Sequence, residues 1–470
     1  MKIKSITIEQ LFGGEIPYHL ELMCEEGVII LHAQNGMGKT TVLSMVPAIV
    51  FANYQFLNST PFKKATLELE DGTIINVEKK SVFDSILDFD VENEEIPYAY
   101  DTEEIQIERR RRKNEIKYTV IPIGEKEFSS HINPPTRPER VIHSRMQAVD
   151  SSVPIPLRRR YLMGVFNKPD FVESYIQITR DLAINFIKAD RLYVDSRESR
   201  SFARGRHYSS QEIEQEGNIK IEAITECAYD LRERINAVKR RKEEVSEGLD
   251  RTFPKRVVDH YKNNNNLDED NIRDQLQQLE EKRKELENIG LINDENESGT
   301  FSSSEEFPKD SLPVLEIYIE DNNKKLAAYN KLKRQIDLLL KAINESNAFS
   351  KKKLVIDTTS AQFAMKFIAE GNEGREIPLE RLSSGEKHAL ILFYRLIFNS
   401  KEGSLVMIDE PEISLHISWQ QHFITSLLEI CRENMLYAVV ATHSPDIVMG
   451  HYELLVNLDG SPVDDDEEEE

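Results

Sequence analysis

The sequence predicts an α/β protein with a helical, coiled-coil-like insertion, and three features support this. Continuous apolar runs at 27–31, 404–408 and 439–441 are typical of strands buried on both faces of a sheet. The first run leads through a glycine-rich turn into a helix. A stripe of apolar residues between 221 and 249 has the spacing of a coiled-coil seam.

The first eighty residues are expected to form strands interrupted by one helix, over about 39–51. Pro47 lies inside that helix and is expected to kink or shorten it. Asp71-Gly72 stands between two short apolar runs, and such a pair supplies the positive φ angles of a hairpin turn. Further strands are expected at 3–8, 18–23, 116–123 and near 192–194.

Composition divides the 470 residues into four segments. An N-terminal lobe with a β-rich insertion spans 1–205, a helical insertion spans 206–350, and a C-terminal lobe spans 351–457. The acidic tail, 458–470, repels itself and is expected to be disordered. The helical segment fits two arrangements, an ordinary helical domain packed on itself or an antiparallel arm, and we favour the arm.

The charge balance is acidic, with a formal net charge of -23 and 30% charged residues. This chain therefore lacks the positive footprint of an electrostatic nucleic-acid binder, so DNA is not the favoured partner. Basic runs at 109–113, 158–160 and 239–242 leave a DNA contact open, but such runs are usually solvated surface.

Cysteine use and hydropathy indicate a reducing compartment. Cys24, Cys227 and Cys431 are far apart and odd in number, which argues against a disulfide framework or a zinc cluster. The N-terminus runs straight into an alternating strand without a signal peptide, and no stretch reaches the ~18 apolar residues of a membrane span. We therefore expect a cytoplasmic protein with no membrane partner.

The glycine-rich turn has the context of a phosphate-binding loop, because it follows a buried strand and opens a helix. Gly36 and Gly38 let successive backbone N–H groups point at a phosphate, and the helix N-terminus adds a positive partial charge. Lys39 can reach the β- and γ-phosphates, and the Thr40 hydroxyl can bind magnesium. Ala33 stands where the first glycine of the pattern is usual. The candidate nucleotide contacts are Asn35, Gly36, Met37, Gly38, Lys39, Thr40 and Thr41.

Three downstream segments suit the same chemistry. Leu382-Ser-Ser-Gly-Glu-Lys-His388 precedes an apolar helix and offers Ser384, Gly385 and Glu386 as a second anion site. A buried strand ends in Asp409, which suits magnesium, and Glu410, which suits a water positioned for attack. Another ends in His443, which could sense the γ-phosphate. Taken singly, each segment has an ordinary structural explanation, such as a capping histidine.

In this order the motifs resemble those of the ABC ATPase superfamily. The wording DEPEISLH at 409–416 and ATHSPDIV at 441–448 is similar to the RecF, SMC and OLD-like branch. The resemblance implies an ABC-type P-loop ATPase head with a helical insertion, which uses ATP and Mg²⁺. It assigns Lys39 and Thr40 to phosphate and magnesium, Asp409 to magnesium, Glu410 to catalysis and His443 to the switch.

The resemblance also implies a dimer. It assigns Ser384 and Gly385 to the γ-phosphate of the partner subunit's ATP and places 414–416 at the interface, with a higher oligomer left open. Two features depart from the family. The glutamine that completes magnesium coordination is not placed, with Gln55 and Gln147 as candidates, and 11–14 lack the basic residue that touches nucleotide in relatives.

Three biological roles compete. The first is an antiphage-defence ATPase, similar to those of PARIS or Septu. It would act as a sensor or scaffold and control a separate toxic protein, expected to be a nuclease, with a phage protein as trigger. OLD-like relatives carry a nuclease after the switch histidine, but few residues follow His443 here. The second is a RecF- or SMC-like DNA repair or chromosome-maintenance ATPase. The third, which the helical insertion opposes, is a transporter subunit.

Overall fold

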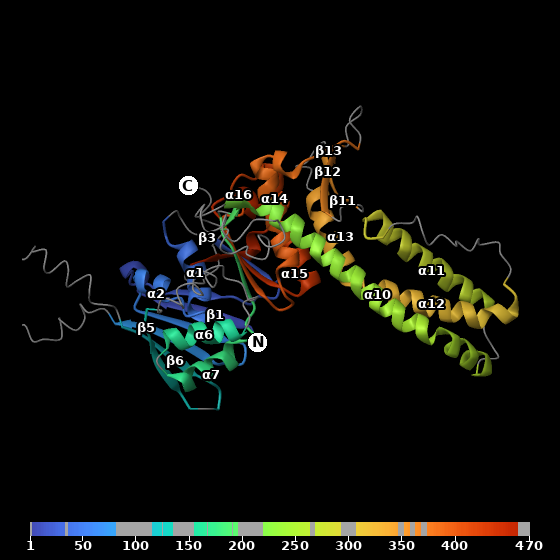
Figure 1. The fold of residues 1–470 in the computed structure, drawn as a ribbon. Coiled ribbons are helices and arrows are strands. Elements are labelled where there is room, and N and C mark those ends of the chain that lie inside the picture. Colours follow the sequence, from blue (N-terminus) through green and yellow to red (C-terminus); the bar gives the residue numbers. More distant parts are fainter. Residues whose placement is uncertain are drawn as a thin grey trace, which may run out of the picture. The chain divides into compact units, whose positions relative to one another are not determined.

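Strands rich in buried apolar residues form a parallel sheet in the computed structural model of the chain (Figure 1). The described residues divide into two units, Met1–Arg191 with Asn399–Glu470, and Leu192–Phe398. The structure describes residues 2–32, 36–80, 115–124, 126–134, 155–166, 168–189, 191–195, 220–263, 268–292, 307–345, 352–357, 362–367 and 374–458. The predicted acidic tail therefore falls almost wholly outside these ranges.

The parallel sheet of the first unit has the strand order β16-β3-β15-β14-β8. Its three central strands are the apolar runs that the sequence predicts. Because parallel strands end at the same edge of a sheet, the residues that follow β3, β14 and β15 come together. The strands are β3 (Val28–His32), β8 (Ile184–Ile187), β14 (Leu405–Asp409), β15 (Tyr437–Ala441) and β16 (Leu455–Asn457).

A second, antiparallel sheet in this unit has the order β2-β1-β4-β5-β6-β7. The predicted hairpin is confirmed: β4 and β5 pair across Asp71-Gly72, where Gly72 has φ 81°. The strands are β1 (Ile3–Glu9), β2 (Tyr18–Glu21), β4 (Lys64–Leu69), β5 (Ile74–Lys80), β6 (Glu115–Ile121) and β7 (Phe128–Ile132).

Helix α1 (Lys39–Val50) begins at the glycine-rich loop and is buried on nearly every side. It shares one core with residues of both sheets. The helix continues through Pro47 to Val50, so the predicted shortening at the proline does not occur. The other helices of this unit are α2 (Tyr54–Ser59), α6 (Ile155–Val165), α7 (Pro169–Thr179), α15 (Ile417–Asn434) and α16 (Pro445–Val448), with 3₁₀ turns at Leu11–Gly13 and Tyr452–Leu454.

The end of α1 explains why one residue of the basic run 158–160 is not solvated, whereas Arg159 and Arg160 are exposed as expected. Arg158 is buried, and its guanidinium donates to the carbonyls of Val50 and Thr179, each at 3.0 Å. The hydroxyls of Tyr118 and Tyr175 donate to the carbonyl of Ile49 at 3.0 and 2.8 Å. The last carbonyls of a helix have no partner inside it, so a buried helix end needs donors of this kind.

The second unit is mainly helical. Its helices are α10 (Ala223–Asn263), α11 (Glu269–Asn288), α12 (Leu312–Ala327), α13 (Asn330–Asn344) and α14 (Ser384–Phe398), with a 3₁₀ turn at Lys309–Ser311 and another at Leu379–Arg381. A two-stranded sheet pairs β9 (Tyr193–Asp195) with β10 (Lys220–Glu222), and a three-stranded sheet contains β11 (Lys352–Asp357), β12 (Gln362–Phe367) and β13 (Glu376–Ile377).

The apolar stripe predicted between 221 and 249 falls mostly on α10. Ile224, Ala228, Leu231 and Ile235 are buried, whereas Val238 onward is half-buried. Ile221 lies in β10 and not in the helix. We call residues 250–325 the arm; they contain the outer part of α10, together with α11 and most of α12.

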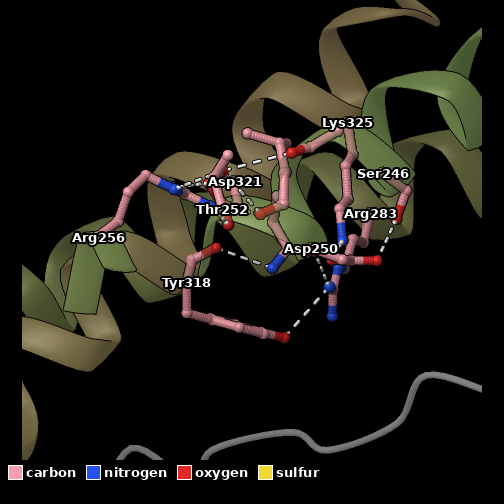
Figure 2. Close-up of polar contacts among 11 residues, drawn as sticks. Ser246, Asp250, Thr252, Arg256, Arg283, Tyr318, Asp321 and Lys325 are labelled. Carbon is pink, nitrogen blue, oxygen red and sulfur yellow. Dashed lines mark hydrogen bonds and ion pairs between the residues drawn. The ribbon is translucent and has the colours of Figure 1, made fainter. Parts of the chain in front are cut away.

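Polar contacts between α10 and α12 show how these two arm helices run relative to each other (Figure 2). Lys325 Nζ of α12 lies 3.3 Å from Asp250 Oδ1 of α10, and His260 of α10 contacts Glu316 of α12 at 2.6 Å. Residue numbers thus rise along one helix as they fall along the other, so α10 and α12 are antiparallel. Arg256 donates from both terminal nitrogens to the carboxylate of Asp321, which is 7% exposed, at 2.5 and 2.6 Å.

Replacing Arg256 with methionine is expected to loosen the arm by about 2 to 3 kcal/mol, because Asp321 would keep a buried charge without its partner. Hydrogen exchange in α12 should accelerate by about 30-fold or more. Arg251→Met is the matched control, since its contact with Glu247 on the same helix is exposed and 3.9 Å long. Equal exchange in both variants would contradict a stabilising role for the Arg256–Asp321 pair.

Helix α14, which carries the Ser384 motif, is bonded to α10 within the second unit. Tyr394 of α14 donates to Asp230 of α10 at 2.5 Å, and Arg234 donates to the same carboxylate at 2.7 Å. Lys387 contacts Glu222 at 3.0 Å. The unit boundary therefore falls after Phe398, which differs from the predicted boundary at 350/351, and the first boundary falls at 191/192 where 205/206 was expected.

Candidate nucleotide-binding site

The glycine-rich loop ends in a backbone conformation that favours glycine. Gly36 and Gly38 have φ angles of 84° and 89°, in the left-handed region. At Gly38 a Cβ would also lie 2.8 Å from the ring of Phe12. Gly38 caps α1, so the free N–H groups of the first helical turn begin at Lys39. Asn35 and Ala33 lie outside the described residues.

Lys39 lies at the centre of the site and is buried. Its Nζ is 2.9 Å from Nδ1 of His443, which follows β15. Burial lowers the pKa of the Lys39 ammonium, while the nearby carboxylates of Glu412, Glu410 and Asp409 act in the opposite direction. Lys39, which is predicted to bind the β- and γ-phosphates, is thus in direct contact with His443, which is predicted to sense the γ-phosphate.

Thr40 and Asp409 form the second contact of the site. The Thr40 hydroxyl donates to Asp409 Oδ1 at 2.9 Å across 369 residues of sequence. Burial raises the pKa of Asp409, and the carboxylates of Glu410 and Glu412 add to that effect, whereas the bond from Thr40 lowers it. A hydroxyl and a carboxylate are the hard oxygen ligands that Mg²⁺ prefers, so the residues present fit a magnesium ion.

Glu410 is held in an unusual backbone conformation by bonds on both sides. Its φ is 44°, a conformation that costs a residue other than glycine about 1 to 3 kcal/mol and persists only where the surroundings impose it. Its N–H donates to the Ala441 carbonyl at 2.8 Å, and the fully buried Arg191 donates to the Pro411 carbonyl at 2.8 Å. These bonds fix the turn that presents the Glu410 side chain. The sequence analysis did not identify Arg191.

His443 is exposed and is held through its backbone. Its N–H donates to Glu412 Oε1 at 2.8 Å. The next residue, Ser444, bonds through its N–H to Thr442 and through its hydroxyl to Gln420. Glu412 was not among the predicted site residues, although it belongs to the quoted motif at 409–416.

The remaining predicted loop residues lie at the edge of the site. Met37 is exposed, and its carbonyl accepts a hydrogen bond from the Tyr18 hydroxyl at 3.3 Å. Thr41 is half-buried in the first turn of α1. Gln55 is exposed on α2, and Gln147 lies outside the described residues.

The second predicted anion site belongs to the other unit. Ser384 is exposed at the start of α14, and Gly385 follows in its first turn. Glu386 accepts from the Ser383 N–H at 2.9 Å while its own N–H donates to the Ser383 hydroxyl at 3.3 Å, which is a capping box. The other oxygen of Glu386 contacts Lys352 at 2.7 Å. Glu386 was predicted to contact nucleotide, but both of its carboxylate oxygens are bound to other residues of this unit.

A family of known proteins matches slightly less than half of the chain. Residues 236–449 match the family described as "AAA domain, putative AbiEii toxin, Type IV TA system". Protein ea59 of Escherichia phage lambda is 40% identical over 72 residues, which are 15% of this chain and 13% of that protein. The chain therefore aligns with only a small part of that relative's length.

Two solved structures of Smc head domains can be aligned with most of this chain, at low identity and low TM-score. The Smc head domain with an extended coiled coil, bound to the C-terminal domain of ScpA and derived from Pyrococcus furiosus, is 12% identical, with 97% of this chain and 93% of that chain covered and a TM-score of 0.32. The Smc head bound to the C-winged helix domain of ScpA is 9% identical, with 97% and 94% covered and a TM-score of 0.34.

No described helix is long and apolar enough to cross a bilayer. The predicted fold class is confirmed: the chain has an α/β P-loop ATPase fold with helical insertions, and residues 236–449 match an AAA-type ATPase domain.

Proposed function

We propose that this protein binds ATP with Mg²⁺ at the start of α1 and hydrolyses it. The observation that carries the proposal is the pair of contacts Thr40–Asp409 and Lys39–His443, each 2.9 Å long, at the shared edge of the parallel sheet. A hydroxyl, a carboxylate, an ammonium and an imidazole thus converge where free N–H groups begin a helix.

The residues divide the work of phosphoryl transfer, which is mainly positioning and electrostatic stabilisation. Thr40 and Asp409 would hold Mg²⁺, which when bound neutralises charge on the phosphates. Lys39 leaves the imidazole of His443 and pairs with the β- and γ-phosphates. Glu410 orients the attacking water and accepts its proton, while His443 becomes available to the γ-phosphate.

A second copy of this chain completes the site in this proposal. Ser384 and Gly385 would contact the γ-phosphate of the partner's ATP. Support comes from the exposure of Ser384 at the start of a 15-residue helix, where the positive end of the helix dipole favours an anion. ATP would then hold two copies together, and hydrolysis would release them.

The biological role that we propose is antiphage defence, in which the ATP state controls a separate toxic effector, such as a nuclease, in the cytoplasm. The description of the matching family, which names a putative AbiEii toxin and a Type IV TA system, supports a two-component toxin–antitoxin setting but does not say which component this chain is. A partner that prefers either the closed or the open assembly would be held or released as that population changes.

The test has a biochemical and a cellular arm. The purified protein should release phosphate from ATP with Mg²⁺ and lose that activity in EDTA. Absence of phosphate release both with Mg²⁺ and with EDTA would refute the proposal that it is an ATPase. In cells challenged with phage, this gene should protect only together with the neighbouring gene. Toxicity of the gene alone would make the chain itself the effector, and salt-dependent DNA binding would favour the repair-like role.

The arm is expected to serve assembly or partner contact and not nucleotide binding. The side chains of Asp250 and Lys325 contact each other, with Lys325 Nζ 3.3 Å from Asp250 Oδ1, so α10 and α12 are neighbours at this level and a Gly-Ser linker from Leu249 to Leu326 can replace residues 250–325. The deletion should leave the ATP dissociation constant within about threefold, which is under about 1 kcal/mol, and change the oligomer or the effector complex in mass photometry. Loss of ATP binding by a folded deletion protein would refute this role.

A further inference from the structure

Glu412 connects two parts of the site that follow different strands. It stands in the turn after β14, yet its Oε1 accepts the backbone N–H of His443, which follows β15, at 2.8 Å. Its Oε2 is buried and has no hydrogen-bond partner among the described residues. A buried carboxylate is costly to keep, so a role for this one is expected.

The turn that carries Glu412 is rigidly held. The Glu410 N–H is bonded to Ala441, the Pro411 carbonyl accepts from the buried Arg191, and the Ile413 N–H bonds back to the Glu410 carbonyl at 3.2 Å. A carboxylate on such a base can fix the group that it binds.

The imidazole of His443 has a partner that the proposed chemistry takes away. Its Nδ1 lies 2.9 Å from Lys39 Nζ, and Lys39 must turn to the phosphates when nucleotide binds. The backbone bond to Glu412 does not involve the imidazole, so it can persist through that change. It would then hold the position of His443 while the side chain exchanges one partner for another.

We propose that Glu412 is a positioning residue for His443, which it holds in place for the γ-phosphate through the Oε1···H–N bond. This inference rests on the proposed function, because the role of His443 is assigned there. Glu412 does not touch substrate in it; it acts through His443.

The test compares Glu412→Ala, Glu412→Asp and Glu412→Gln. Alanine removes the acceptor, and aspartate keeps the charge on a side chain one methylene shorter; both should expose the His443 amide to exchange at least about tenfold faster in the nucleotide-free protein. Both should lower kcat about tenfold to 100-fold, as misplacement of a reacting group does, with the ATP dissociation constant within about threefold. Glutamine keeps an acceptor at Oε1 and should stay within about threefold of wild type in exchange and kcat.

Glu402→Gln is the matched control, because Glu402 is exposed before the other end of β14. Unchanged exchange of His443 in the aspartate variant would overturn the proposal even if the alanine variant fails to fold. So would a glutamine variant that protects His443 but loses kcat as fully as alanine, since the charge would then matter and not the bond. If wild type hydrolyses no ATP, the proposed function fails, whereas faster exchange in the alanine and aspartate variants would still support the hold of Glu412 on His443.

Discussion

Replacing Glu410 with glutamine is expected to lower kcat for ATP hydrolysis by about 100-fold or more while ATP binding is kept. Proton transfer by a positioned side chain contributes about 10² to 10⁴ in rate, and an amide cannot accept the proton of the attacking water. Thr40, Asp409 and Lys39 are untouched, so the nucleotide and Mg²⁺ should still bind. Steady-state phosphate release, together with the ATP dissociation constant from calorimetry, measures both effects.

The stalled variant should also accumulate the ATP-bound dimer. Mass photometry with ATP should therefore show more of the associated species than in wild type, whose hydrolysis releases it. Glu402→Gln makes the same charge change before the opposite end of β14 and should behave as wild type. Turnover in Glu410→Gln equal to wild type would show that Glu410 does not assist the attacking water.

Replacing Lys39 with alanine is expected to weaken ATP binding by about 100-fold or more. The Lys39 ammonium is the buried cation of the loop, and hydrogen bonds to charged groups contribute about 1.5 to 3 kcal/mol each, so losing its contacts to two phosphates costs about 3 kcal/mol or more. Calorimetric titration with ATP and Mg²⁺ gives the dissociation constants directly.

The same substitution removes the Nδ1 contact of His443 but no apolar core contact. The variant should therefore fold, and its circular dichroism spectrum should match that of wild type. Lys63→Ala is the matched control, because Lys63 is exposed beside β4 in the same unit. ATP affinity in Lys39→Ala equal to that of wild type would remove the phosphate-binding role of the loop.

Sequence alone predicted those parts of the candidate site that are contiguous in the chain. The glycines, Lys39 and Thr40 follow one another, and the physics of the loop is local: positive φ at Gly36 and Gly38, then the N–H groups of a helix that begins at Lys39. Strands β3, β14 and β15 could be predicted for a similar reason, since a strand buried on both faces is one unbroken apolar run.

Short segments and segments of mixed polarity were predicted less well from the sequence. Strand β8 (Ile184–Ile187) has a half-buried centre and was not predicted, whereas the strand expected near 192–194 is β9, in the other unit. The run 158–160 reads as solvated surface by composition. Arg158 is buried because the carbonyls at the end of α1 need donors, and sequence does not show which helix end lies beside it.

Only the tertiary structure decided which distant residues meet. In the sheet, β15 separates β14 from β3, and all three parallel strands end at the same edge. Asp409 at the end of β14 therefore reaches Thr40, which follows β3 in the chain. The same edge brings Glu412 to the backbone of His443 and Arg191 to the carbonyl of Pro411, two partnerships without a local signal. The unit that ends at Phe398 likewise contains both α14 and α10, which the bond from the Tyr394 hydroxyl to Asp230 joins across 164 residues of sequence. A motif whose residues are neighbours in the chain can be recognised from the sequence. Strand order and helix pairing depend on long-range contacts, which no pattern in a single sequence specifies.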